Sequence, residues 1–183
     1  NTAALASGGG GPAGNTIESE TESWNGTSWT EVNDLNTARR QFAGSCGSQT
    51  AALAFGGELG PAGTNEVTNN ESWNGTSWTE VNDLNVATRS GAASGTSSLA
   101  LQFGGVDDSP VVTGRSQSWN GTTWTNENFL NTPVANQAGG KTAPSSAALN
   151  FGGTAPSIPG DSAFTEEWSG TGEITRTITT TTE

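Results

Sequence analysis

The sequence contains no histidine, no tyrosine and no methionine, and it has one cysteine among its 183 residues. Without histidine, the Cys-His arrangements used for metal binding and for nucleophilic catalysis are excluded. Cys46 has no second cysteine with which it could form an internal disulfide. Because Cys46 follows a run of alanine, glycine and serine, we expect it to be a small core residue.

Basic residues are also scarce, since six Lys and Arg stand against 18 Asp and Glu, for a formal net charge of -12. This charge repels phosphate backbones, and no basic cluster occurs, so nucleic acid is not an expected partner. No apolar run is long enough to span a bilayer, so membrane insertion is not expected either. The sequence begins at Asn1 inside a repeat, and we expect further residues upstream.

A strict repeat is present despite the low hydrophobic content of 31%. An apolar run that ends in Gly-Gly occurs four times, and its leucines are each 48 residues apart, at Leu5, Leu53, Leu101 and Leu149. The following tryptophans are separated by 49, 46 and 49 residues, at Trp24, Trp73, Trp119 and Trp168. Insertions therefore fall between Gly-Gly and Trp, where we expect a loop.

Each repeat also carries a hairpin signal. The segment Trp-Asn-Gly-Thr-Ser-Trp begins at Trp24 and at Trp73, a variant begins at Trp119, and an eroded copy begins at Trp168. Asn-Gly tolerates the positive φ angles of hairpin turns, and a Trp on either side can cover the same face of the sheet. The segment therefore predicts two short strands joined by a tight turn.

Four short strands are predicted within the second repeat, and none of them has a helical period. Their ranges are 40–45, 50–55, 67–73 and 78–81, with turns at 46–49 and 74–77. Four antiparallel strands in about 48 residues are typical of a β-propeller blade. The first strand of each unit is rich in small residues, as in Ala43-Gly44-Ser45, which suits the innermost strand of a blade.

These elements together resemble the kelch repeat. The resemblance rests on Gly-Gly after the second strand, on Trp24 and Trp29 around a turn, and on the segment 35–39 that leads to the next first strand. It covers essentially the whole chain and implies an all-β, kelch-like β-propeller of four-stranded antiparallel blades. Tryptophan stands where that family usually has tyrosine. The last repeat departs from the pattern after Trp168, and we read 174–179 as a closing outer strand.

The expected organisation is a single domain over 1–183. It comprises four repeat units, and the first of them lacks its innermost strand. Three arrangements stay open: a closed four-bladed ring, part of a larger propeller, and a ring in which a partner chain supplies the missing strand. The approximate units are 1–38, 39–87, 88–134 and 135–183.

No enzymatic activity is expected. Kelch-type propellers include copper oxidases, whose sites need tyrosine and histidine, and this sequence has neither. The acidic clusters at Asp107-Asp108, at Glu166-Glu167 and between Glu18 and Glu22 are expected to be solvated loop acids or charges that guard strand edges. No catalytic, cofactor or metal residue is predicted. Arg39, Arg40 and Arg89 are expected to form salt bridges or to cap carbonyls between blades.

Ligand contact is expected on the face that carries the variable loops, since recognition is normally placed on variable loops of a rigid scaffold. The loops are 10–19, 58–69, 106–117 and 154–165. The candidate binding residues are Glu58, Asn65, Asp107, Asp108, Arg115 and Asp161.

The exact amino-acid sequence of the repeats also resembles kelch-like repeats in tail or fibre proteins of marine bacteriophages. That resemblance implies a structural and recognition role in a virion, with other virion proteins or copies of the same chain as partners and host surface glycan as a ligand. The alternative is a secreted or cell-surface module, similar to a lectin, that binds glycan or protein.

Overall fold

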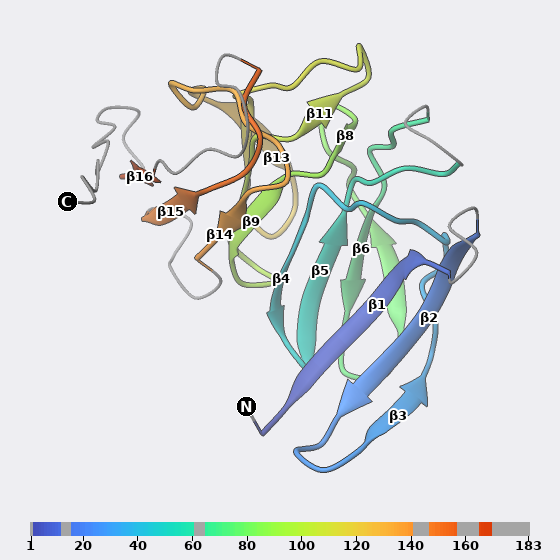
Figure 1. The fold of residues 1–183 in the computed structure, drawn as a ribbon. Coiled ribbons are helices and arrows are strands. Elements are labelled where there is room, and N and C mark those ends of the chain that lie inside the picture. The colour runs from blue at the N-terminus through green and yellow to red at the C-terminus, as the bar shows by residue number, and fades with distance from the viewer. Residues whose placement is uncertain (1, 12–15, 61–64, 141–146, 157–164, 170–183) are drawn as a thin grey trace, which may run out of the picture.

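The computed structural model describes residues 2–11, 16–60, 65–140, 147–156 and 165–169 of the chain. Within these ranges all regular structure is β-strand, and no helix occurs (Figure 1). The predicted all-β class is therefore confirmed. The same ranges contain no helix that could span a membrane.

Four antiparallel sheets, here called the repeat sheets, follow one another along the chain, and consecutive strands pair within each. A small fifth sheet pairs β8 (Thr88–Arg89) with β11 (Val106–Asp107). The first sheet contains β1 (Ala4–Gly10), β2 (Ile17–Trp24) and β3 (Trp29–Val32); the second β4 (Gly44–Ser48), β5 (Ala51–Phe55), β6 (Asn70–Trp73) and β7 (Trp78–Val81); the third β9 (Ala92–Gly95), β10 (Ala100–Phe103), β12 (Ser116–Trp119) and β13 (Trp124–Glu127); the fourth β14 (Ala138–Gly139), β15 (Ala148–Phe151) and β16 (Thr165–Trp168).

The Asn-Gly hairpins form as predicted in the first three sheets. In the second sheet, Asn74 Oδ1 accepts hydrogen bonds from the backbone N–H groups of Thr76 and Ser77, both at 2.9 Å. Gly75 has a φ of 94°, which residues with a Cβ rarely adopt. Equivalent turns in the other two sheets are centred on Asn25 and Asn120.

The two tryptophans of a hairpin form a pair that covers the preceding repeat. Trp73 lies opposite Trp78 in the ladder, and their ring centroids are 5.4 Å apart. Both pack against Leu5 and Leu35 of the first repeat, and only 2% and 6% of their surfaces are exposed. The Trp78 indole also donates a hydrogen bond of 3.0 Å to Thr21 Oγ1 in the first sheet. Adjacent sheets therefore pack face to face.

The same packing recurs between the second and third sheets. Trp119 and Trp124 cover Leu53 and Phe55, and the Trp124 ring meets the Phe55 ring edge-on at 4.8 Å between centroids. Trp168 of the fourth sheet packs in turn against the third-sheet cluster. Burying a large aromatic ring stabilises a fold by roughly 1.5 to 3 kcal/mol, so these pairs compensate for the few aliphatic residues.

Glycine allows the repeats to approach closely. Gly56 and Gly57 have φ angles of 61° and 107°, and the Gly57 N–H donates to the Thr88 carbonyl of the next repeat at 2.8 Å. A Cβ at Gly139 in β14 would lie 2.6 Å from the Ala93 carbonyl oxygen in β9, so the first strands of adjacent sheets pack at backbone distance. The predicted role of small residues in these strands agrees with this contact.

A chain of backbone hydrogen bonds links the segments that enter successive sheets. The Ser90 N–H donates to the Gln41 carbonyl, and the Asn136 N–H donates to the Ser90 carbonyl, both at 2.8 Å. All three residues have positive φ angles, of 48° at Gln41, 52° at Ser90 and 57° at Asn136. The repeats are thus joined at equivalent points.

The boundaries of the first strand in the second repeat differ from the prediction. Gln41 turns the chain, and β4 begins at Gly44 rather than at residue 40. Cys46 was expected in a turn and lies in the strand opposite Leu53, while the turn falls at residues 49–50. The expectation that Cys46 is a core residue is confirmed, because it is 7% exposed and burial raises the pKa of its thiol to about 12.

A buried ion pair joins the strands of the second sheet. The Arg39 Nη2 lies 3.0 Å from Glu71 Oε1, and both side chains are fully buried. Arg39 also donates to the carbonyls of Gly56 and Asn69, each at 2.8 Å. Burial lowers the pKa of Arg39 from its ordinary value, and the Glu71 carboxylate opposes that shift. The predicted salt bridge and carbonyl capping are both present, but they act within one sheet rather than between blades.

The third sheet fills the equivalent positions without charge. Thr88 stands where the second repeat has Arg39, Gln102 stands where it has Ala54, and Gln117 stands where it has Glu71. Gln117 Nε2 donates to Gln102 Oε1 at 3.4 Å. Gln117 Oε1 accepts from the Asn85 backbone N–H at 2.8 Å, just as Glu71 Oε2 accepts from Asn36. We refer to these three positions as the buried polar triad.

The equivalence of the triads predicts a compensated substitution. Glu71→Gln leaves Arg39 buried without its counter-charge and is expected to lower the free energy of unfolding by about 3 kcal/mol. Adding Arg39→Thr and Ala54→Gln recreates the uncharged triad of the third sheet and is expected to restore more than half of that loss. Urea denaturation of the single and triple variants measures both values. A triple variant less stable than Glu71→Gln would contradict the equivalence.

Candidate functional site

The structure brings three of the predicted binding residues together in the loop that follows β10. Asp107, Asp108 and Arg115 lie between β10 and the start of β12, which places them on the predicted loop face. Glu58 and Asn65 lie in the corresponding loop of the second repeat. Asp161 lies outside the described residues.

The third-repeat loop is braced by its own backbone. The Asp107 N–H donates to the Val111 carbonyl at 3.1 Å, and the Thr113 N–H donates to the Gly105 carbonyl at 2.9 Å. The Arg115 N–H donates to Thr113 Oγ1 at 3.1 Å. These bonds fix the backbone from which Asp107 and Arg115 extend, so little loop entropy would be lost on binding a ligand.

Arg115 lies between an acid and an aromatic ring. Its Nε is 3.5 Å from Asp107 Oδ2, and its guanidinium carbon is 5.4 Å from the centroid of the Phe129 ring. Phe129 is 60% exposed and Val111 is 55% exposed, and Asp108 is exposed as well. Asp107 is only 8% exposed, and its Oδ1 accepts a hydrogen bond from the Ser109 N–H at 3.1 Å, so the expectation that Asp107 is a solvated loop acid is wrong. We call the group formed by Asp107, Asp108, Val111, Arg115 and Phe129 the Arg115 surface.

Phe129 was missed by the sequence analysis, although the repeat register carries a signal for it. The preceding repeats have acids at this position, Asp34 and Asp83, and each acid accepts a hydrogen bond from its own sheet or loop. The third repeat replaces that structural acid with an exposed aromatic ring. At this position the other two repeats use a polar contact within the repeat. In the third repeat the Phe129 ring instead lies beside the Arg115 guanidinium group.

The corresponding loop of the second repeat is arranged differently. Glu58 is fully buried, with Arg40 Nε 2.7 Å from its Oε1 and Arg89 Nε 3.4 Å from its Oε2. Arg89 also lies 2.8 Å from Glu66 and therefore joins the third repeat to the second, as predicted for an arginine between blades. The Glu58 carboxylate holds the loop in place and is not open to a ligand, whereas Asn65 is exposed.

The expectation that Glu166 is a solvated or edge charge is wrong. Glu166 lies in β16 and is 4% exposed, and its Oε1 accepts a hydrogen bond from the Thr132 N–H at 3.1 Å. Burial raises the pKa of Glu166 above its ordinary value, and hydrogen bonds from Thr132 and Asn131 oppose that shift. Glu166 occupies the triad position of Glu71 and Gln117, and here Val134 stands where the second repeat has Arg39.

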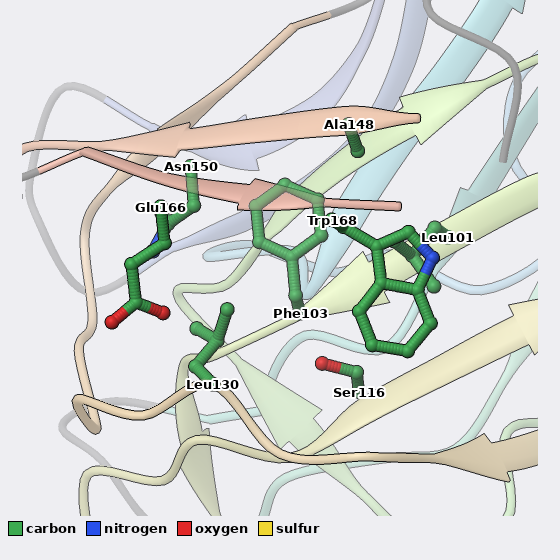
Figure 2. Close-up of a pocket in the computed structure, with 8 residues that line it drawn as sticks. All are labelled: Leu101, Phe103, Ser116, Leu130, Ala148, Asn150, Glu166 and Trp168. Carbon is green, nitrogen blue, oxygen red and sulfur yellow. The ribbon is translucent and has the colours of Figure 1, made fainter. Parts of the chain in front are cut away.

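A small cavity adjoins Glu166 between the third and fourth sheets (Figure 2). Its volume is about 10 Å³, enough for roughly one water molecule. Figure 2 shows the Ser116 hydroxyl pointing toward the space between Leu130 and the Trp168 indole. Within the described ranges, Ser116 Oγ and Asn150 Oδ1 make no hydrogen bond. The cavity is an incompletely filled contact between sheets and is too small for an organic ligand.

The described residues hold no group of three or more His, Cys, Asp or Glu side chains that could bind a metal ion. In comparisons with known proteins, no protein-family model and no curated protein sequence matches the chain. The Arg115 surface is therefore the candidate functional site on the strength of its own geometry.

Replacing Glu166 is expected to change the pH dependence of stability. Because the folded-state pKa of Glu166 is raised, its protonated form contributes stability at low pH, and that contribution is lost as the pH rises through the folded-state value. Glu166→Gln, which copies Gln117, is expected to raise the Tm at pH 7 by roughly 1–3 °C. The difference should vanish below about pH 4.

Thermal unfolding followed by circular dichroism between pH 3.5 and 7.5 measures this difference. The adjacent exposed Glu167→Gln removes one negative charge without touching the interface and serves as the matched control. A Glu166→Gln variant that is less stable than the parent at pH 7 would contradict the assignment of a buried carboxyl group.

Proposed function

We propose that the chain is a non-enzymatic structural and recognition module, built as a kelch-like β-propeller and carried in a phage virion as a tail or fibre component. The Arg115 surface is its contact for host surface glycan. Other virion proteins or further copies of the chain are its structural partners. The propeller is either a closed four-bladed ring or part of a larger one.

The repeated contacts support the propeller. Each repeat sheet is an antiparallel meander, and the tryptophan pair of one sheet covers the sheet before it, on Leu53 and Phe55 in the second sheet and on Leu5 in the first. Gly9, Gly57 and Gly105 each donate a backbone hydrogen bond of 2.8 Å to the segment that enters the next sheet. Similar contacts between successive units favour a similar rotation from one unit to the next, and this regularity supports a radial arrangement of blades.

The Arg115 surface is the observation that carries the ligand proposal. A sugar ring presents an apolar C–H face that stacks on an aromatic ring, and its hydroxyl groups both donate and accept hydrogen bonds. Phe129 supplies the exposed ring, Arg115 supplies donors, and the exposed Asp108 supplies acceptors, while the buried Asp107 holds Arg115 in place. This combination on a braced loop suits a neutral or amino sugar better than a polyanion, because the chain carries a net charge of -12.

The virion assignment rests on the resemblance of the repeats to phage tail and fibre proteins. The second candidate is a secreted or cell-surface module, similar to a lectin, that uses the same Arg115 surface outside any virion. The exposed Phe129 favours glycan contact equally in both settings. The two candidates therefore differ in location and share the binding chemistry.

Loss of Phe129 is expected to weaken glycan binding. Phe129→Asp copies the acid of the preceding repeats and removes the ring without adding a buried group, so it should weaken binding at least tenfold, or about 1.4 kcal/mol. Arg115→Ala should weaken it by a similar factor. A glycan array identifies the ligand, and calorimetry with the bound glycan measures the variants.

Leu59→Ala provides the matched control, because Leu59 occupies the position of Asp107 in the second repeat and is 38% exposed. This variant should bind as the parent chain does. Failure of the parent chain to bind any glycan, or unchanged binding by both Phe129→Asp and Arg115→Ala, would contradict the proposal. Immunogold labelling of phage particles then separates the two locations, since a label on the tail supports the virion and a label confined to particle-free medium supports the secreted module.

A further inference from the structure

The outer face of the first sheet carries the same types of residue that, in the second and third sheets, are covered by the preceding repeat. Each later sheet has a triad acceptor that takes a backbone hydrogen bond from the connecting segment of the preceding repeat: Glu71 from Asn36, Gln117 from Asn85, and Glu166 from Thr132. Glu22 occupies the same position in β2, two residues before Trp24, and is exposed. An open groove of about 400 Å³ runs beside it, lined by β1 and by Glu18, Glu20 and Glu22.

The tryptophan pair of this face is also open. Trp24 and Trp29 have centroids 5.5 Å apart and planes inclined at 44°, close to the 5.4 Å and 46° of Trp73 and Trp78. Trp78 is 6% exposed because the first repeat lies against it, whereas Trp29 is 48% exposed. The pair is therefore already arranged as it would be under a covering sheet. We call Glu22, Trp24 and Trp29 the head face.

The opposite end of the repeat series presents the surface that such a pair covers. Leu149 and Phe151 of β15 are each 43% exposed. Their counterparts are buried beneath the tryptophans of the next sheet and are at most 2% exposed: Leu53, Phe55, Leu101 and Phe103. We call Leu149 and Phe151 the tail face. Figure 1 shows β15 and β1–β3 on opposite sides of the view, so the two faces do not cover one another.

We propose that the head face of this chain docks on the tail face of a second copy, with the contact that joins successive repeats inside one copy. The occupant follows from continuity with the internal interfaces. The head face carries the aromatic pair and the acceptor of the second and third sheets, and the tail face carries the Leu-Phe pair that tryptophans bury on the second and third sheets. A second copy therefore supplies, through its tail face, the surface that the head face of the first copy covers.

The type of contact determines which kinds of assembly can form. A head-to-tail contact is heterologous, so it forms a closed ring if the rotation between copies closes and an open filament if it does not. This inference depends on the packing of the repeat sheets and is independent of glycan recognition, so either can fail while the other stands.

Two single substitutions separate the faces. Trp29→Glu places a charge on the head face, and Phe151→Glu places one on the tail face. Both side chains are more than 40% exposed in the single copy, so neither change should disturb folding. Each variant alone should self-associate at least about 30-fold more weakly than the parent chain, because a charge replaces an aromatic anchor in every contact. Sedimentation velocity across a concentration series measures the change.

Mixing the two variants provides the decisive test. The Trp29→Glu copy retains an intact tail face and the Phe151→Glu copy retains an intact head face, so an equimolar mixture forms one fully native contact. The mixture should give a 1:1 dimer in native mass spectrometry at concentrations where each variant alone is monomeric. Leu59→Glu, which changes an exposed side chain outside both faces and outside the Arg115 surface, should associate as the parent does.

Three outcomes would overturn the proposal. The first is a parent chain that stays monomeric over the whole concentration range, as expected if the head and tail faces of one copy close on each other. The second is a pair of single variants that associate as strongly as the parent. The third is a mixture that associates no more strongly than its separate components. Circular dichroism melting of each variant verifies that a loss of association does not come from unfolding.

Discussion

The packing of a tryptophan pair on the preceding sheet is the interaction on which the rest of this structure depends. Hydrophobic residues make up only 31% of the chain, too few for a core of ordinary aliphatic composition. Each Asn-Gly hairpin places two indoles side by side, and these indoles cover the preceding sheet, as Trp124 of the third sheet does with Phe55 of the second at 4.8 Å between ring centroids. A single sheet would leave these surfaces in water, so each repeat is stable only beside another.

Different polar side chains occupy the same buried position between the sheets in different repeats. The second repeat uses a buried Arg39–Glu71 ion pair, the third uses a Gln102–Gln117 amide contact, and the fourth has a carboxyl group beside a cavity. In all three, the acceptor on the third strand takes a backbone N–H from the connecting segment. That backbone contact is the constant requirement, and the groups behind it vary from an ion pair to an amide contact and to a carboxyl group near Asn150, whose Oδ1 makes no hydrogen bond within the described residues.

Much of the fold could be predicted from the sequence because the repeat multiplies weak local signals. The 48-residue period and the Asn-Gly turns identified the hairpins, the all-β class and the small residues of the first strands. Strand boundaries near Gln41 could not be predicted, since a positive φ at a non-glycine residue leaves no mark in composition. The burial of Glu58 and Glu166 was missed for a related reason, because their partners approach from other strands and connecting segments. Phe129 becomes visible only when its repeat is compared with the acids at the same position.

A double-mutant cycle between Phe55 and Trp124 tests the central claim most directly. Each residue is replaced by leucine, singly and together, and urea denaturation gives the coupling between them. If the aromatic contact between sheets supplies the stability, the coupling should be about 0.5–1.5 kcal/mol. The same cycle between Phe55 and Trp24, which lie in different interfaces, should be additive within about 0.5 kcal/mol. Additive effects at Phe55 and Trp124 would contradict the account.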